Sequence, residues 1–312
     1  MSATIVIEQM IMIVLLIAIG FYSYRKSILS DEATRGISAL VVNFTNPCLM
    51  AYSMLSSGER VSGRLLFMGM LSALAAYALL ILMAELIPRL LKVEVSERYC
   101  YWMLCVFGNT GFIGIPLTNA VLGPDALVYV CFHNLIFSLL IYTVGISKIR
   151  SAAGNADKGG ESALYMLRRF INTGTVSVIV ALILYITGAS LPSLIMSTMD
   201  YAGRATTFLS MMILGTAVAR MSVKEVISDV RLIVFSLIRL IAIPALLLFL
   251  LKLFIHEDLI IYTAALMLAV PAGNMPLIIA TQHGLKARTI SDGIVLTTIL
   301  SVVTIPIVAL LV

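Results

Sequence analysis

Two stretches rich in asparagine, glycine and proline stand out, because both lie inside segments that are apolar enough to cross a bilayer. Residues 107–123 read FGNTGFIGIPLTNAVLG, and residues 269–284 read AVPAGNMPLIIATQHG. Each places a Gly/Asn cluster before Pro-Leu and ends a short apolar run on glycine. Asparagine amides and unpaired backbone N–H groups can bind a carboxylate without the desolvation cost of a permanent charge. The two stretches therefore predict a binding site for a small organic anion.

The prolines of these stretches predict broken helices. Proline removes a backbone donor and clashes with the preceding turn, so we expect one helix to break at Pro116 and another at Pro276. Non-helical backbone at membrane depth survives only where protein buries it or water reaches it. Half-helices that begin near the two prolines would present partial positive charge. Paired broken helices at corresponding places in two halves are typical of a transporter's binding site.

The composition is that of an integral membrane protein. The chain is 61% apolar and 12% charged, with a mean hydropathy of +1.06, whereas soluble domains are about 45–50% apolar and about 25% charged. A span needs about 20 mostly apolar residues. We expect ten spans, over residues 5–24, 36–56, 65–87, 101–123, 125–146, 172–190, 197–219, 230–254, 259–283 and 289–311.

The placement of basic residues predicts the orientation. With the N-terminus outside, sixteen of the 21 Lys and Arg fall in inner loops and three in outer loops. We therefore expect a multi-pass protein of the plasma (inner) membrane with both termini outside. The net charge of +5 is a topology signal in this chain, and nothing in it indicates nucleic-acid binding.

A small, polar, glycine-rich segment divides the chain into two halves of five spans. We expect a first five-helix repeat over residues 1–150, a flexible cytoplasmic linker over 151–170, and a second repeat over 171–312. Because each half has an odd number of spans, the second repeat is inserted upside down relative to the first.

Three further polar residues fall within spans. Asn134 is expected to face the cavity, while Asn43 either lines the path or belongs to a packing kink beside Pro47. Arg239 lies about 13 Å into its span, near the bilayer midplane. Its charge marks a functional position, or it is satisfied by backbone carbonyls that the helix breaks release.

The remaining residue types exclude other classes of protein. The four cysteines have neither disulfide nor metal-site spacing and are expected to be packed free thiols. There is no Gly-x-Ser-x-Gly elbow, no His-Glu-x-x-His motif and no buried Asp pair. We therefore expect no enzyme activity, no metal and no cofactor.

Two motifs resemble those of a known family. Asn-Thr-x-x-x-Gly-Ile-Pro-Leu at residues 109–117 and PAGNMP at residues 271–276 are similar to the two crossover motifs of the auxin efflux carrier family. That family includes plant PIN-type carriers and bacterial malate or malonate permease-like members. The resemblance covers nearly the whole chain, with span 2 around Pro47, span 7 around Gly215 and span 8 around Arg239 also similar.

The resemblance implies a fold and a site. The fold is an all-α membrane bundle of ten helices in two inverted repeats, with broken crossover helices in the fourth and ninth spans, as in the NhaA antiporter and bile-acid symporters. Spans 1, 2, 6 and 7 would form a scaffold and a homodimer interface, and spans 3–5 and 8–10 a transport bundle moving by an elevator mechanism. The site would comprise the motif residues Asn109, Thr110, Gly111, Pro116, Gly273, Asn274 and Pro276.

Departures from the family pattern bear on the substrate. The central loop is much shorter than in plant members, and Asn43 with Asn46 makes span 2 more polar than an indole acid would favour. A smaller carboxylate is the better expectation. A sodium-coupled organic anion symporter of the bile-acid type is the alternative, and an intramembrane sensor is a further one. The sequence leaves the substrate, the direction of flux and the coupling ion open.

Overall fold

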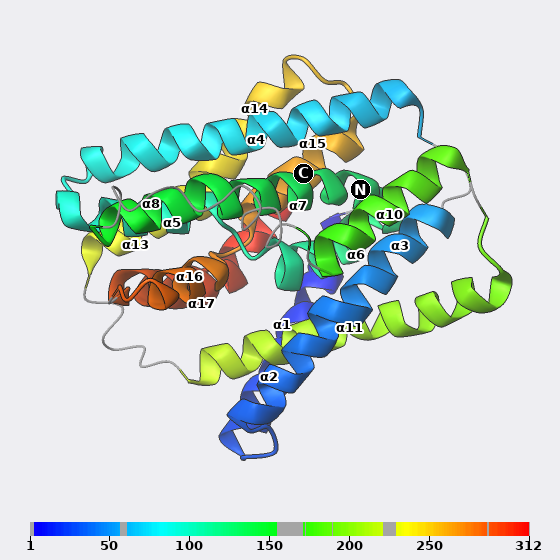
Figure 1. The fold of residues 1–312 in the computed structure, drawn as a ribbon, viewed down its shortest axis with the longest axis horizontal. Helices are drawn as coiled ribbons and strands as arrows, with labels where there is room; N and C mark the ends of the chain where they lie inside the picture. Colours follow the sequence, from blue (N-terminus) through cyan, green and yellow to red (C-terminus); the bar gives the residue numbers. More distant parts are fainter. Residues whose placement is uncertain are drawn as a thin grey trace.

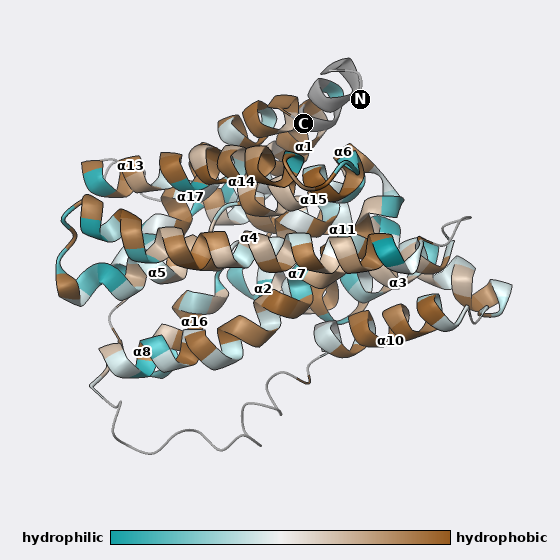
Figure 2. Cartoon of the chain, turned by 90° about the horizontal axis from the view of Figure 1, so that it is seen from above, coloured by the Kyte–Doolittle hydropathy of each residue, from teal (hydrophilic) through white to brown (hydrophobic). Residues whose placement is uncertain are grey.

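The chain folds into a bundle of apolar helices. The computed structural model describes residues 3–56, 61–154, 171, 173–188, 190–220, 229–285 and 287–311, and these residues contain helices but no β-strand. Figure 2 shows apolar residues along most of the helices, with hydrophilic residues gathered toward helix ends such as those of α5 and α13. Five described helical segments are long and apolar enough to cross a membrane: 63–90, 124–152, 193–219, 230–252 and 288–311. The protein is therefore a multi-pass, all-helical membrane protein.

The first half of the chain contains eight α-helices and several short irregular turns of helix. In order they are α1 (Ala3–Arg25), α2 (Asp31–Leu40), the π-helix η1 (Val41–Thr45), α3 (Asn46–Ser56), α4 (Gly63–Leu90), η2 (Val95–Glu97), α5 (Arg98–Val106), the π-helix η3 (Thr110–Gly114), α6 (Ile115–Leu122), η4 (Pro124–Ala126), α7 (Leu127–Leu140), the π-helix η5 (Ile141–Gly145) and α8 (Ile146–Ala152). Helices α2, η1 and α3 run on without a break, as do α7, η5 and α8.

The described part of the second half is also helical. Its described elements are α10 (Thr173–Thr187), α11 (Ser193–Ala219), α13 (Val230–Leu237), the π-helix η6 (Ile238–Ala242), α14 (Ile243–Lys252), α15 (Asp258–Ala269), α16 (Met275–Gln282) and α17 (Arg288–Leu311). Of the predicted linker at 151–170, the first residues belong to α8 and its turn, and residues 155–170 lie outside the described part of the chain.

The helices pack in two groups. Helix α1 crosses and packs against α11, and both α10 and α11 pack against α3 (Figure 1). Gly215 permits the close approach of α11 to α1, because a Cβ there would lie 2.2 Å from the carbonyl oxygen of Ile17. In the other group, α4 packs against α5 and α7, α14 against α15, and α17 against α13 and α15. All four cysteines are free thiols, and Cys100, Cys105 and Cys131 are buried.

The prediction that the first helix breaks at Pro116 is wrong. Pro116 is the second residue of α6, which continues from the π-helix η3, and the chain leaves helical geometry earlier, at residues 107–109. In this π-helix the N–H of Ile115 donates to the carbonyl of Thr110, five residues earlier. The carbonyl of Gly111 would therefore pair with residue 116, which is a proline and has no N–H. The Nδ2 of Asn46 donates to that carbonyl instead, at 3.0 Å. A neighbouring helix thus satisfies the acceptor that the proline leaves free.

The second interruption lies where the proline predicts it. The chain is non-helical at residues 270–274, and α16 begins at Met275 with Pro276 as its second residue. Proline is well tolerated in the first turn of a helix, where its missing N–H has no intrahelical acceptor.

Candidate functional site

The two interruptions of the helices pair with each other. Gly108 and Ala272 form an isolated antiparallel bridge. The N–H of Asn109 donates to the carbonyl of Pro271 at 2.7 Å, and the N–H of Gly273 donates to the carbonyl of Phe107 at 2.9 Å. Residues 107–109 and 270–274, hereafter the paired breaks, therefore satisfy part of each other's backbone, which non-helical chain inside an apolar bundle requires.

Two motif glycines allow this close pairing. A Cβ at Gly108 would lie 2.8 Å from Cγ2 of Val270, and a Cβ at Gly273 would lie 3.0 Å from the carbonyl oxygen of Gly108. Both distances are shorter than ordinary van der Waals contact. The Gly/Asn clusters of the sequence thus supply backbone that can approach another backbone at the centre of the bundle.

Arg239 binds the ends of both interrupted helices. It lies in η6 and is fully buried. Its Nε donates to the carbonyl of Cys105 at 2.7 Å, and its NH1 donates to the carbonyl of Leu268. These carbonyls belong to the last turns of α5 and α15, where a helix leaves acceptors without an intrahelical donor. Of the two interpretations open from the sequence, the structure shows the arginine bound to carbonyls that the breaks release.

A cavity of about 510 Å³ lies beside the paired breaks. Its wall includes residues from η1, the two breaks, η3, α7, η5 and the start of α10. Seven of the residues predicted for the site line it: Asn43, Asn109, Thr110, Gly111, Asn134, Gly273 and Asn274. Pro116 and Pro276 are buried in their helices and Arg239 lies behind the breaks, so these three do not line the cavity.

Side-chain hydrogen bonds hold the first break in place. The Oδ1 of Asn109 accepts from the N–H of Phe112 at 3.2 Å, which caps the start of η3. The hydroxyl of Thr110 donates to Oδ1 of Asn134 at 2.9 Å, and Nδ2 of Asn134 donates to the carbonyl of Val130 at 3.1 Å. Helix α7 therefore fixes the position of the residues that follow the break.

The second break is held differently. Asn274 is the N-cap residue of α16, yet no side chain caps this helix. The hydroxyl of Thr297 in α17 accepts from the N–H of Ala272 at 3.1 Å. Asn274 and Met275 line the cavity, so the first N–H groups of α16 lie at the cavity wall. The N-cap side chain accepts no hydrogen bond from them.

The lining of this cavity is polar but uncharged. Among the described residues that form its wall there is no Asp, Glu, Lys, Arg or His. The polar groups are amides and hydroxyls, and they include Ser138, Tyr142 and Thr173, which the sequence reasoning missed. Asn134, Ser138 and Tyr142 are spaced four residues apart, so they share one helix face, and this spacing could have revealed them.

Asn46 is another polar residue that the predicted site omitted. It lines a smaller cavity of about 130 Å³, which shares Gly111, Asn134 and Ser138 with the larger one. Its Nδ2 donates to Gly111, while its Oδ1 and the hydroxyl of Thr45 are buried without a partner among the described residues.

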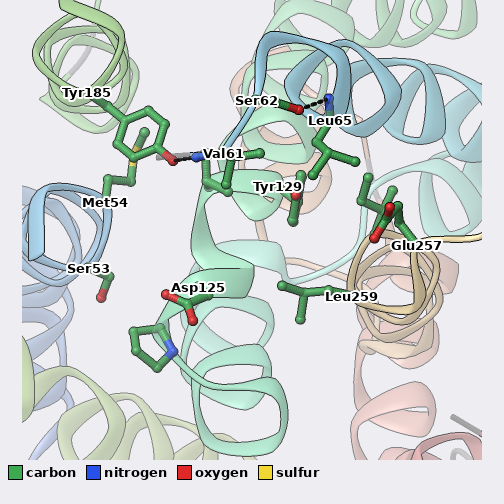
Figure 3. A pocket seen from close by; sticks show the side chains of 13 residues that line it. Ser53, Met54, Val61, Ser62, Leu65, Asp125, Tyr129, Tyr185, Glu257 and Leu259 are labelled. Atoms are coloured by element: carbon green, nitrogen blue, oxygen red, sulfur yellow. Dashed lines mark hydrogen bonds between the residues drawn. The ribbon is translucent and has the colours of Figure 1, made fainter. Parts of the chain in front are cut away.

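A separate cavity of about 610 Å³ lies between α3, α7, α10 and α15 and shares no lining residue with the first (Figure 3). Its wall carries two carboxylates, Asp125 and Glu257, and the hydroxyl of Tyr185 accepts from the N–H of Val61 at 2.6 Å. All of its lining residues belong to helix ends and turns that the charge pattern predicts to lie outside.

Comparison with known proteins finds a family and several relatives for the chain. A family model described as "Membrane transport protein" matches residues 5–309. An "Uncharacterized transporter" of Methanocaldococcus jannaschii is 24% identical over 304 residues, which cover 96% of each chain. A "Putative malonate transporter" of Rhizobium meliloti is 27% identical over 222 residues, covering 68% of this chain and 66% of that protein. An "Uncharacterized transporter" of Methanothermobacter thermautotrophicus is 22% identical over 307 residues, covering 96% of each chain.

Proposed function

The chain belongs to the membrane transport protein family, as its two motifs predict, and on this premise we propose that it is a secondary carrier for a small organic anion. One observation carries the proposal. The wall of the cavity at the paired breaks carries amides, hydroxyls and the uncapped start of α16, and none of its described residues is a carboxylate. Such a wall suits a ligand that brings its own negative charge and many acceptor oxygens.

Two further features favour an anion. The helical segments η3 and α16 both begin at the cavity wall, where the partial positive charge of a helix N-terminus lies. The guanidinium of Arg239 lies directly behind the wall, with NH2 3.1 Å from the position that a Cβ of Gly108 would occupy. Its charge adds positive potential without contact to the substrate, and burial weakens the screening of that potential.

The substrate class that fits best is a small mono- or dicarboxylate. The malonate named for the Rhizobium meliloti relative belongs to this class. Asn43, Asn109, Asn134 and Asn274 distribute amides around the wall, which suits two carboxylate ends better than an aromatic ring.

We propose further that the architecture is that of an elevator carrier. It would have ten spans in two inverted repeats over residues 1–150 and 171–312, with the paired breaks as the crossing of the fourth and ninth spans. The packing of α1, α3, α10 and α11 supports a scaffold formed by those helices and a transport bundle formed by the others. A homodimer through the scaffold would follow.

The conformation in the structure would be open to the cytoplasm. Tyr142, Ile171, Thr173 and Ile278 line the site cavity and adjoin the segments that the basic residues place inside. The cavity with Asp125 and Glu257 shares no lining residue with the site cavity, and the basic residues predict that it lies on the outer side. With the protein in the plasma membrane and both termini outside, motion of the bundle would expose the site alternately to each side.

The test is counterflow in liposomes that contain the purified protein. Labelled malonate, malate, lactate and indole-3-acetate are offered against the same unlabelled acid inside. We expect exchange of at least one small carboxylate, its loss in Asn109→Ala, and its retention in Asn119→Ala. Asn119 lies in α6 and does not line the cavity, so it is the matched control. No exchange of any organic acid by folded protein would contradict the proposal.

A sodium-coupled version of the same carrier is the second candidate. It is favoured by the buried oxygens of Asn46 and Thr45, which have no hydrogen-bond partner among the described residues and could serve as cation ligands. Replacement of the sodium gradient by an N-methylglucamine gradient would stop accumulation in a coupled carrier and leave it unchanged in a uniporter.

A further inference from the structure

Another cavity, of about 420 Å³, lies where α4, α5 and α8 meet. Its lining includes Glu85, Arg98, Tyr99, Trp102 and Lys148, and it shares no lining residue with the site cavity. These helix ends all belong to the side that the basic residues place in the cytoplasm. Hereafter it is the helix-end cavity.

The charge of the helix-end cavity is positive. The ammonium of Lys148 lies 2.6 Å from Oε1 of Glu85, and Arg89 lies 3.0 Å from Oε2 of the same carboxylate. Two cations therefore share one anion. Arg98 donates through Nε to the neutral carbonyl of Val93 at 3.1 Å and makes no ion pair within the described chain. Nearby Glu97 does not line the cavity. The cavity therefore has positive charge left to bind an anionic ligand.

An aromatic wall positions one of these cations. Trp102 is buried, and the ammonium of Lys148 lies 5.2 Å from the centre of its ring. This distance is within the range of a cation–π contact. Tyr99 lines the same cavity. Tryptophan and tyrosine are enriched where a membrane's apolar core meets its headgroups.

Exposed apolar residues lie at the end of α4 and in the turn that follows it. Leu90, the last residue of α4, is 78% exposed, and Val95, which lines the cavity, is 77% exposed. Leu82, Leu86 and Leu90 share the face of α4 opposite Ala84 and Pro88, which line the cavity. The exposed apolar side chain at the cavity itself is therefore Val95.

We propose that the helix-end cavity binds the headgroup of an anionic phospholipid of the inner leaflet. Arg98 and Lys148 would hold the phosphate, and the hydroxyls of Ser96 and Ser151, which also line the cavity, would donate to it. The first methylenes of the acyl chains would contact Val95 at the edge of the cavity. A free phosphate ion could use the same cations, but it would leave this exposed apolar side chain without an apolar contact.

The protein contains its own probe for this test. Trp102, which lines this cavity, is the single tryptophan of the chain, so all of the tryptophan fluorescence comes from this position. Purified protein is titrated with phosphatidylglycerol that carries brominated acyl chains, which quench tryptophan on contact. A parallel titration uses brominated phosphatidylcholine. We expect quenching at lower concentrations of the anionic lipid.

Charge variants then assign the preference to the cavity. Arg98→Gln and Lys148→Gln are each expected to weaken binding of the anionic lipid about fivefold, the equivalent of the roughly 1 kcal/mol that one basic residue contributes at an anionic surface. Arg98→Lys should retain most of the preference. Arg35→Gln is the matched control, since Arg35 is an exposed cation that does not line the cavity.

Three outcomes would overturn the proposal. The first is equal quenching by the two lipids in the wild-type protein, a result that needs no variant to fold. The second is an unchanged headgroup preference in the Arg98→Gln and Lys148→Gln proteins. The third is reversal of the quenching by millimolar inorganic phosphate or glycerol phosphate, which would assign the cations to a soluble phosphate. Transport does not enter the readout, so the carrier proposal stands or falls separately.

Discussion

The two breaks in the helices satisfy their polar groups in different ways. At the first, Asn109 caps its own half-helix, Asn46 of α3 donates to Gly111, and Thr110 donates to Asn134 of α7. At the second, α16 starts without a side-chain cap. Polar side chains from two neighbouring helices therefore brace the first break, while the second leaves its first N–H groups at the cavity wall. The first would position the site, and the second would supply most of its donors to the anion.

Loss of Arg239 should have the largest effect, because this residue serves both breaks. Arg239→Ala leaves the carbonyls of Cys105 and Leu268 buried without a donor. We expect a loss of about 3 kcal/mol or more in stability, measured as thermal unfolding in detergent. Arg239→Lys should restore only part of it, because a lysine has no planar fork. Arg204→Ala is the control, since its pair with Asp200 is exposed. Wild-type stability of the Arg239→Ala protein would show that Arg239 does not stabilise the two breaks.

Gly108→Ala should come next, because its Cβ would clash with Val270. We expect a loss of about 1–3 kcal/mol, as for overpacked cores. Gly111→Ala is the matched control in the same motif, where a Cβ would meet only Nδ2 of Asn46, at 3.9 Å. The comparison uses thermal unfolding of both variants. Equal destabilisation by the two would show that the close pairing of the breaks is not what Gly108 provides.

Replacing the asparagine of each break should have different effects: one variant should lose only anion affinity, and the other should lose both affinity and stability. Asn274→Ala removes donors but no cap, so we expect about tenfold weaker anion binding at nearly unchanged stability. Asn109→Ala removes the cap on Phe112 as well, and should also lose about 1 kcal/mol of stability. Binding is measured with the anion found in counterflow, and unfolding on the same samples. Identical profiles for the two variants would contradict the difference between the breaks.

The smallest effect is expected for Thr110→Val. It removes the hydrogen bond to Asn134, and such bonds between membrane helices average about 0.6 kcal/mol. Thr143→Val, whose hydroxyl bonds only the Leu139 carbonyl of its own helix segment, is the control. Thermal unfolding should show a small loss for Thr110→Val beyond that of the control. A loss as large as that of Gly108→Ala would show that α7 braces the first break far more strongly than one hydrogen bond allows.

Much of this organisation was predictable, because membrane spans and broken helices have strong signatures. Long apolar runs locate the helices, and the Gly/Asn clusters locate the non-helical backbone. The position of the first break was not predictable from Pro116. The π-helix η3 continues into α6 and carries the proline, and Asn46 donates to Gly111 from 65 residues away in sequence.

The environment of side chains was the harder part. The sequence left two interpretations of Arg239 open, a charge for function and a donor to released carbonyls, and its contacts with Cys105 and Leu268 show the second. The helix-end cavity depends on α4, α5 and α8 meeting in space. No local pattern in the sequence places Lys148 beside Glu85 and Trp102.

The most direct test of the central claim reverses the charge at the second break. Asn274→Asp places a carboxylate on the cavity wall where the anion is proposed to bind, and Asn119→Asp adds the same charge outside the cavity. We expect Asn274→Asp to weaken binding of the transported anion at least about tenfold, because a like charge at close range costs more than 1.4 kcal/mol. Asn119→Asp should leave it unchanged. Unchanged or tighter binding in Asn274→Asp would contradict an anion site at the paired breaks.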